Sequence, residues 1–420
     1  MRTFFFVVLL AVFSASCTLA PLRPAVSAKP AEKAEAAIQE PEDIPDAGTE
    51  VQDELLHKTL LCTFAGDLMA HKVNFTMGNY DLIYDNVKKI LHNDDFSFIN
   101  VETPVCDTLP LSTYPSFNVH TPYLRAAVHA GFDVLSFANN HTNDHGVRGI
   151  DGSLAAVRTL QEERAAAQDG SDSASPPLIF SGLKDEIEEP IRVVSISYRN
   201  WNILFCSVTE LLNSYGESKK RLYYSAPTKE GRAKLLDLIQ KARIDYPCDL
   251  FILSLHLNEP EYIRTVSPEK KEWFKQLGEA GIDIIWAHHP HVMQPWEIMK
   301  VKRFLPQNTE DEQGDEDCPV VCMYSMGNFI SGQRWNVRYD NPAFYREYTG
   351  DAVLLQLQCT KNGNGGIEFG IFPILITQYN DPAPVVKQFT QEWINALPEK
   401  EKLYFKKRFL LMKEYLPFTE

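Results

Sequence analysis

Residues 282–291 run Ile-Asp-Ile-Ile-Trp-Ala-His-His-Pro-His, which joins an apolar segment to a cluster of histidines. The apolar part, residues 282–286, predicts a buried strand, so the histidines lie where that strand ends. Binding and catalytic groups of α/β proteins gather at such ends. Neutral imidazole is the commonest metal ligand, and positions 288–291 hold three of the 11 histidines in the 420-residue chain. The segment therefore predicts a metal site at the end of a strand.

Within this cluster, we expect His289 and His291 to be the better ligands. Side chains two positions apart on an extended segment point to the same side. On that geometry His288 faces the opposite side, and we expect it to contact substrate.

Other predicted strands also end in polar residues, and these blocks contain Asp67, Glu102, Asn139–Gly146, His256 and Asn328. Each block alone also fits an ordinary turn or cap, but strand ends at one edge of a sheet converge in space. Together they supply oxygen and nitrogen ligands for one or two divalent ions. This mixture suits Mn, Fe, Zn or Co better than Cu(I) or Ca. In the third block, an Asn carbonyl could bind a metal while His141 faces the substrate as general acid.

The order of predicted elements is that of an α/β domain. Apolar patterns predict strands at 59–65, 95–101, 132–138, 192–198, 202–208, 249–255, 352–358 and 367–377. They predict helices at 80–92, 123–130, 229–242, 269–280 and 388–413, the last one interrupted at Pro398. Strands that alternate with helices form βαβ units, and the adjacent strands 192–198 and 202–208 predict a hairpin.

Charge is concentrated in two segments. The chain is 44% hydrophobic and has a formal net charge of −15. Residues 29–54 carry a net charge of −7 and residues 307–318, a predicted solvated insertion, carry −6, which leaves about −2 for the rest. The folded domain therefore carries almost no net charge, and its charge does not exclude an anionic substrate. No basic stripe indicates a nucleic-acid partner.

The N-terminus resembles a targeting segment. Arg2 precedes the apolar run 4–13, and small residues lead to Cys17, which predicts a secretory signal over 1–17. The apolar run is too short for a permanent membrane span. The residues before Cys17 are similar to a bacterial lipobox, although Ser14 stands where Leu is usual. We favour acylation of Cys17 over ordinary cleavage nearby, so the protein is expected outside the cytoplasm, at the periplasm or cell surface, on a lipid anchor in the cell membrane.

The chain divides by composition. Residues 18–56 are rich in Ala, Pro and Glu, which predicts a disordered acidic tether. Residues 57–385 form the predicted α/β domain, and 386–420 a C-terminal helical segment. The seven cysteines after Cys17 are odd in number and scattered, which is not the pattern of a disulfide framework.

The polar blocks also resemble a known family, through residues 64–70, 100–104, 139–146, 256–262, 281–297 and 324–329. Two patterns are specific in combination, Asn-Asn-His-x-x-Asp-x-Gly and His-His-Pro-His-Val-x-Gln. The chain is similar over about residues 60–335 to the CapA family of poly-γ-glutamate capsule biosynthesis proteins. These proteins share the calcineurin-like metallophosphatase fold.

This resemblance implies an α/β fold with a four-layer α/β/β/α sandwich. It implies divalent metal near Asp67, Glu102, Asn140, His256, His289 and His291. His141 resembles the general acid of metallophosphatases, which protonates the leaving oxygen. For contact with substrate we expect Asn139, Asp144, His288 and Asn328.

The chain also departs from the wider pattern. Met69 stands where metallophosphatases have a histidine, and Glu102 where they have an aspartate; relatives in the CapA family share both changes. The family's His-Trp-Gly-x-Glu-Tyr becomes His-Leu-Asn-Glu-Pro-Glu-Tyr at 256–262, with Trp and Gly lost. Ala287 replaces a usual Gly.

Three functions follow as hypotheses. The first is a membrane-anchored metal-dependent hydrolase of a phosphoester or a cell-envelope or capsule polymer. The second is a non-catalytic protein that binds or anchors an anionic polymer such as poly-γ-glutamate. The third, a structural metalloprotein or solute-binding lipoprotein, leaves the block 139–146 unexplained.

Overall fold

The computed structural model describes residues 58–168, 176–303, 317–363, 366–380, 382–414 and 416. The predicted signal with Cys17, the tether 18–56 and all but the end of the acidic insertion 307–318 lie outside these residues. Among the described helices, none is long and apolar enough to cross a membrane.

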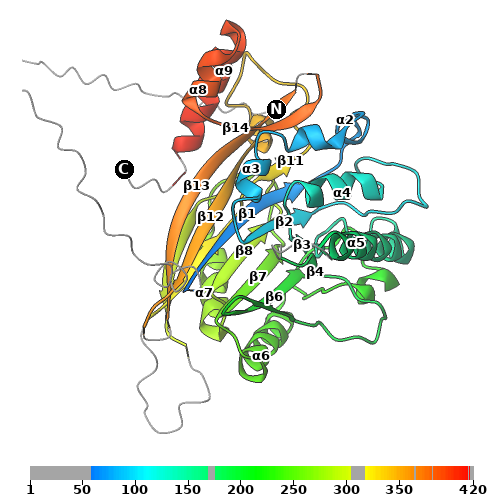
Figure 1. The fold of residues 1–420 in the computed structure, drawn as a ribbon, viewed down its shortest axis with the longest axis vertical. Coiled ribbons are helices and arrows are strands. Elements are labelled where there is room, and N and C mark those ends of the chain that lie inside the picture. The colour runs from blue at the N-terminus through cyan, green and yellow to red at the C-terminus, as the bar shows by residue number, and fades with distance from the viewer. Residues whose placement is uncertain are drawn as a thin grey trace, which may run out of the picture. The chain divides into compact units, whose positions relative to one another are not determined.

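Two β-sheets lie at the centre of the domain (Figure 1). The first sheet contains β1 (Thr59–Leu68), β2 (Phe96–Val101), β3 (Val134–Ser136), β4 (Ile179–Ser181), β11 (Asn328–Ile330), β12 (Asp351–Lys361), β13 (Ile367–Asn380) and β14 (Pro384–Gln388). Its order is β14-β13-β12-β1-β2-β3-β4, and β11 also pairs with β1. The neighbours β1, β2 and β3 run parallel, so their carboxyl ends share one edge.

The second sheet has the order β5-β6-β7-β8-β10-β9. Its strands are β5 (Val194–Tyr198), β6 (Trp201–Thr209), β7 (Leu250–His256), β8 (Ile284–His288), β9 (Trp296–Val301) and β10 (Cys318–Met323). The predicted hairpin is confirmed as the antiparallel pair β5 and β6. Strands β6, β7 and β8 are parallel, which brings the ends of β7 and β8 together.

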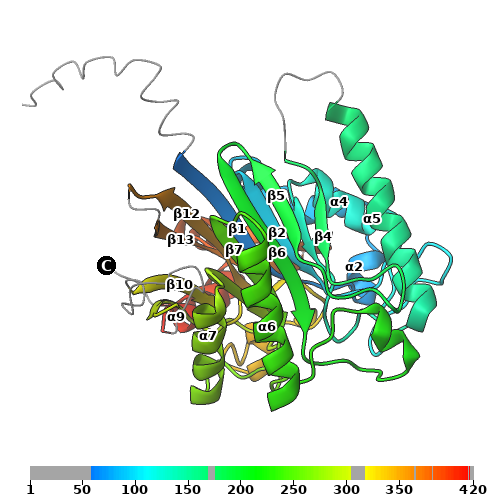
Figure 2. The same cartoon turned by 90° about the horizontal axis from the view of Figure 1, so that it is seen from below.

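Helices cover the outer faces of both sheets. Figure 2 shows α4 (Thr121–His129) and α5 (Gly146–Gln168) on one side of the sheets, and α6 (Lys229–Asp245) and α7 (Pro268–Ala280) on the other. The shorter elements are α2 (Lys72–Phe75), η1 (Tyr80–Ile83), α3 (Lys88–Leu91), η2 (Glu217–Arg221) and η3 (Tyr345–Gly350).

Side-chain alternation along the strands builds three apolar layers. In β8, Ile284 and Trp286 face the first sheet, while Ile285 and Ala287 face the core under α6 and α7. Between the sheets, the rings of Phe64 and Phe98 stack at 4.4 Å. Burying one such large apolar side chain contributes roughly 1.5–3 kcal/mol. Helix, sheet, sheet and helix thus form the predicted four-layer α/β/β/α sandwich.

Two local predictions differ from the structure. The segment 80–92 forms the two short elements η1 and α3 rather than one helix. The 23-residue helix α5 was not predicted. Its sequence is rich in Ala, Arg and Glu, which favour helix intrinsically, but the polar block before it hides its start.

The C-terminal helices pack on the same body. The predicted break at Pro398 is confirmed, since α8 (Gln391–Ala396) and α9 (Glu399–Lys413) flank it. Phe405 joins the core between the sheets, and the buried Arg408 guanidinium pairs with Asp351. The boundary expected after residue 385 falls inside β14.

Candidate metal centre

The centre lies where β1 and β2 of the first sheet meet β7 and β8 of the second. Gly66 allows the close approach of β1 to the segment before β11, because a Cβ there would lie 1.7 Å from the Gly327 carbonyl oxygen. The Asp67 backbone N–H donates to that oxygen at 3.0 Å. The sequence Gly-Asp thus fixes the first carboxylate of the site.

Asp67 is buried among donors. Its Oδ1 accepts from Asn100 Nδ2 at 2.8 Å. Its two oxygens each lie 3.2 Å from the Nδ1 atom of a histidine, His288 for Oδ1 and His291 for Oδ2. Burial favours the neutral acid, but hydrogen bonds and positive charge from the two histidines outweigh it and hold the pKa of Asp67 well below its usual range.

A second group gathers around Glu102. Glu102, His289 and His291 are buried, and one ligand atom of each lies within 4.8 Å of the others. His256 joins them, because its Nε2 lies 3.2 Å from His289 Nδ1 and 3.9 Å from Glu102 Oε1. Carboxylate oxygen and imidazole nitrogen from four residues thus surround one small volume.

Two buried oxygens have no hydrogen-bond partner among the described residues, Glu102 Oε1 in this cluster and Asn140 Oδ1 on the loop after β3. An unsatisfied buried polar atom costs roughly 1–3 kcal/mol. A divalent cation would satisfy oxygens of this kind and would accept the imidazole nitrogens that surround Glu102, so the residues fit a metal.

Burial also shifts the pKa values of Glu102 and of the histidines beside it. Burial, and then the negative charges of Asp67 and Glu261, raise the pKa of Glu102 well above its usual value. Burial lowers the pKa of His256 well below its usual value and that of His289 to about 4. Neutral imidazole is the form that binds metal, and a bound cation would favour the ionised carboxylate.

The histidine triplet is not extended. His289 has φ +106° and His291 has φ +57°, which turn the chain sharply. Non-glycine residues in this region cost about 1–3 kcal/mol each and are frequent at functional sites. The prediction that His288 faces away was wrong. It continues the inward direction of Ile284 and Trp286, and its Nε2 lies 3.1 Å from Ser254 Oγ.

His141 stands at the side of the centre on the loop after β3. Its Nδ1 lies 2.7 Å from Asp144 Oδ2, which also accepts the Phe117 backbone N–H at 2.8 Å. The Phe117 ring packs edge-on against the imidazole at 4.6 Å. Asn213 Nδ2 also lies 3.0 Å from His141 Nδ1, so Nδ1 is held by two neighbours on the loops and Nε2 is left for other chemistry.

The two asparagines before His141 shape this loop. Asn139 Nδ2 donates to the Val101 carbonyl at 2.8 Å, and its Oδ1 accepts the His141 backbone N–H at 3.2 Å. Asn140 Nδ2 donates to Asn213 Oδ1 at 3.2 Å. This bond fixes the Asn140 amide and leaves its oxygen free for a ligand.

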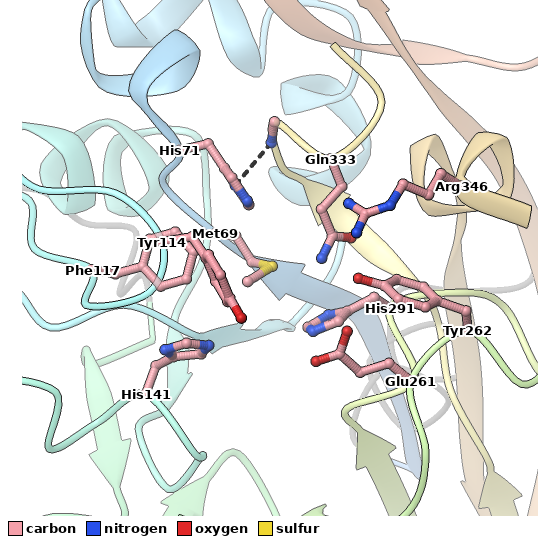
Figure 3. A pocket seen from close by; sticks show the side chains of 11 residues that line it. Met69, His71, Tyr114, Phe117, His141, Glu261, Tyr262, His291, Gln333 and Arg346 are labelled. Carbon is pink, nitrogen blue, oxygen red and sulfur yellow. Dashed lines mark hydrogen bonds between the residues drawn. The ribbon is translucent and has the colours of Figure 1, made fainter. Parts of the chain in front are cut away.

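A cavity of about 330 Å³ opens beside the centre (Figure 3). Of the residues predicted from the sequence, its lining includes His141 and His291. Asn139, Asp144, His288 and Asn328, from which we expected substrate contact, are absent from the described lining. Each instead contacts His141 or a residue of the centre; Asn328 Oδ1, for example, lies 3.1 Å from His291 Nδ1.

Other lining residues were not singled out from the sequence, and these are His71, Tyr114, Phe117, Glu261, Tyr262, Gln333 and Arg346. Glu261 and Tyr262 are the Glu-Tyr pair that the segment 256–262 shares with the family motif, so that match was the signal available for them. Met69 also lines the cavity, so a thioether stands where the wider pattern has a nitrogen ligand.

The match to a protein family covers most of this architecture. Residues 61–333 match the model of the family described as bacterial capsule synthesis protein PGA_cap. The chain belongs to this family. The match runs from β1 to Gln333, so it includes every residue of the candidate centre and ends before Arg346.

Named relatives agree with the PGA_cap assignment. The chain is 25% identical over 345 residues to the capsule biosynthesis protein CapA of Bacillus anthracis, covering 78% of this chain and 70% of the relative. It is 26% identical over 339 residues to the PGA biosynthesis protein CapA of Bacillus subtilis strain 168, covering 78% and 74%. A crystal structure of a hypothetical protein from Thermus thermophilus aligns at 14% identity with a TM-score of 0.39, over 75% of this chain and 98% of that one. That score is too low to support an argument.

Proposed function

We propose that this PGA_cap protein is an extracytoplasmic metal-dependent hydrolase acting on a phosphoester or on an anionic polymer of the cell envelope or capsule. The observation that carries the proposal is the buried cluster of Glu102, His289 and His291 beside an open cavity. A purely structural metal site is usually closed, whereas a catalytic one needs access for substrate. The names of the relatives support a polymer of the capsule.

The metal ligands that we propose come from both sheets, namely Asp67, Glu102, Asn140, His256, His289 and His291. The mixture of oxygen and nitrogen suits one or two ions of Mn, Fe, Zn or Co. When bound, such an ion would supply Lewis-acid charge that polarises the reacting group of the substrate. Met69 supplies no hard ligand, which weighs toward one well-bound ion rather than two equal ones.

His141 acts in this proposal as the general acid. Its ring lies at the cavity wall, and its Nδ1 lies 2.7 Å from Asp144 Oδ2. Protonated at both nitrogens, the ring donates the Nε2 proton to the leaving oxygen, and Asp144 stabilises that charged form. Positioned acids of this kind contribute about 10²–10⁴-fold to a rate.

The direct test is hydrolysis of bis(p-nitrophenyl) phosphate by purified protein. We expect activity that a chelator removes and that Mn, Fe, Zn or Co restores. Protein that binds no divalent metal and shows no metal-dependent hydrolysis would contradict the proposal.

A second function, polymer binding without hydrolysis, is favoured by one observation, the thioether of Met69 in the cavity where metallophosphatases have a ligand. The His141→Ala variant separates the two in cells. Complete retention of capsule-related function in this variant would indicate binding, and loss would indicate chemistry.

Attachment to the membrane is proposed through an acyl chain on Cys17. A Cys17→Ala variant should leave the membrane fraction, and labelled fatty acid should be incorporated into the natural sequence only. Incorporation into both forms would place the lipid elsewhere.

A further inference from the structure

One wall of the cavity carries three hydrogen-bond donors. His71, Gln333 and Arg346 lie together on the side away from His141 (Figure 3). They come from three segments far apart in the chain: the loop after β1, the loop after β11, and η3. None of the three belongs to the candidate metal centre.

His71 presents an N–H to the cavity. Its Nδ1 accepts the Gly332 backbone N–H at 3.0 Å, the bond drawn in Figure 3. Burial, and then the charges of His291 and His141, lower the pKa of His71 to about 4. The ring is therefore neutral near pH 7 with its proton on Nε2, because the other nitrogen is an acceptor.

Gln333 also presents a donor. Its Oε1 accepts from Asn328 Nδ2 at 2.9 Å, which fixes the orientation of the amide. Figure 3 shows the Gln333 amide nitrogen directed toward the cavity. Asn328 in turn contacts His291, so this wall is tied to the candidate centre through one asparagine.

Arg346 supplies the charge of this wall. Its guanidinium lies 5.4 Å from the centre of the Tyr262 ring and 5.9 Å from that of Tyr345, and Nε lies 3.4 Å from the Tyr345 hydroxyl. Within the described part of the chain, no carboxylate forms an ion pair with it. Two aromatic rings thus hold a guanidinium in place and leave its fork available.

We propose that His71, Gln333 and Arg346 form a subsite that binds a carboxylate of an acidic substrate beside the metal centre. Three donors favour an anion at this wall, because the carboxylate of the described lining, Glu261, lies beside His291 and not among them (Figure 3). One formal positive charge with two neutral donors suits a monoanion, and Arg binds carboxylate in a bidentate manner. The inference rests on the proposed function only in taking this cavity as the substrate site.

The test uses chelator-treated full-length protein and a short oligomer of γ-linked glutamate, with binding measured by calorimetry. We expect Arg346→Gln to raise the Kd at least about 10-fold and Arg346→Lys, which keeps the charge but loses the fork, to raise it less. The matched control is Arg338→Gln. Arg338 is exposed and also lies over an aromatic ring, Phe344 at 3.9 Å, but it does not line the cavity.

Several results would overturn the subsite. One is no binding of the oligomer by the natural protein; another is equal affinity of Arg346→Gln and the natural protein. Equal weakening by Arg338→Gln would indicate a general charge effect. Equal binding of the same oligomer with its carboxylates converted to amides would show that the wall does not recognise a carboxylate. Tighter binding of a glycerol phosphate oligomer would show that the wall binds a phosphodiester rather than a carboxylate. Loss of hydrolysis alone would count against the proposed function and leave this inference standing, because the protein tested holds no metal.

Discussion

The candidate metal centre and the donor wall of the cavity face the same space but arise differently. Asp67, Glu102, His256 and His289 all lie at or just after strand ends, where the sheets fix their position. His71, Gln333 and Arg346 lie in loops or a short 3-10 helix beyond the strands. Strand ends fix the chemistry that a fold can support, whereas loops adapt the site to a particular substrate. We therefore expect changes in the centre to abolish activity and changes in the wall to alter binding.

The largest effect is expected from His289→Ala. The variant removes one ligand from the buried cluster and the partner of His256 Nε2. Metal catalysis is worth several kcal/mol, so the rate of phosphodiester hydrolysis should fall by about 10³-fold or more. Steady-state kinetics at saturating metal measure it. His129→Ala, which removes an exposed histidine at the end of α4, is the matched control. A His289→Ala rate equal to the natural rate would exclude the residue from the centre.

A large but distinct effect is expected from His141→Ala. Loss of the general acid should lower the hydrolytic rate about 10²–10⁴-fold, while the metal content stays unchanged because His141 is not among the proposed ligands. Kinetics and elemental analysis on the same preparation check both parts. Loss of the metal along with the activity would show that His141 belongs to the centre.

Asp144→Asn should have a smaller effect on the same step. Asp144 orients His141 rather than touching substrate, and changes in such supporting residues typically cost about 10–100-fold. The pH profile of the rate should shift, which a purely structural role would not cause. Asp85→Asn, at an exposed ion pair with Lys88, is the control, and an unchanged profile in Asp144→Asn would count against the orienting role.

In the wall we expect an effect on stability rather than on the hydrolytic rate, and it depends on pH. The pKa of His71 is about 4 in the folded protein, below its usual value, so the unfolded chain binds the proton more tightly. Stability from neutral His71 is therefore complete above about pH 6.5 and is lost as pH falls toward 4, by up to about 3 kcal/mol. The free energy of unfolding of the natural protein should decline over this window relative to His71→Gln. Parallel pH curves would contradict the assignment.

The sequence predicted the centre better than the wall for a physical reason. Short apolar runs mark buried strands, and polar residues directly after parallel strands share an edge of the sheet. This argument located Asp67, Glu102 and the triplet without any contact being known. The sequence pattern also predicted the break at Pro398, and the family resemblance implied the two-sheet core; the structure confirms both.

Residues whose position depends on turns could not be placed in this way. The direction of His288 was wrong because positive φ angles at His289 and His291 break the alternation of an extended chain. Arg346 follows no pattern in the sequence and reaches the cavity only through η3. Helix α5 was missed because a polar block precedes it and its apolar face is weak.

Elemental analysis of the purified protein tests most directly the central claim, that strand ends of two sheets build one metal centre. After growth with Mn, Fe, Zn and Co, the natural protein should retain one or two divalent ions per chain. A Glu102→Gln, His289→Ala variant should retain none, and His129→Ala should retain as much as the natural protein. Equal metal content in the double variant and the natural protein, or no divalent metal in either, would contradict the account.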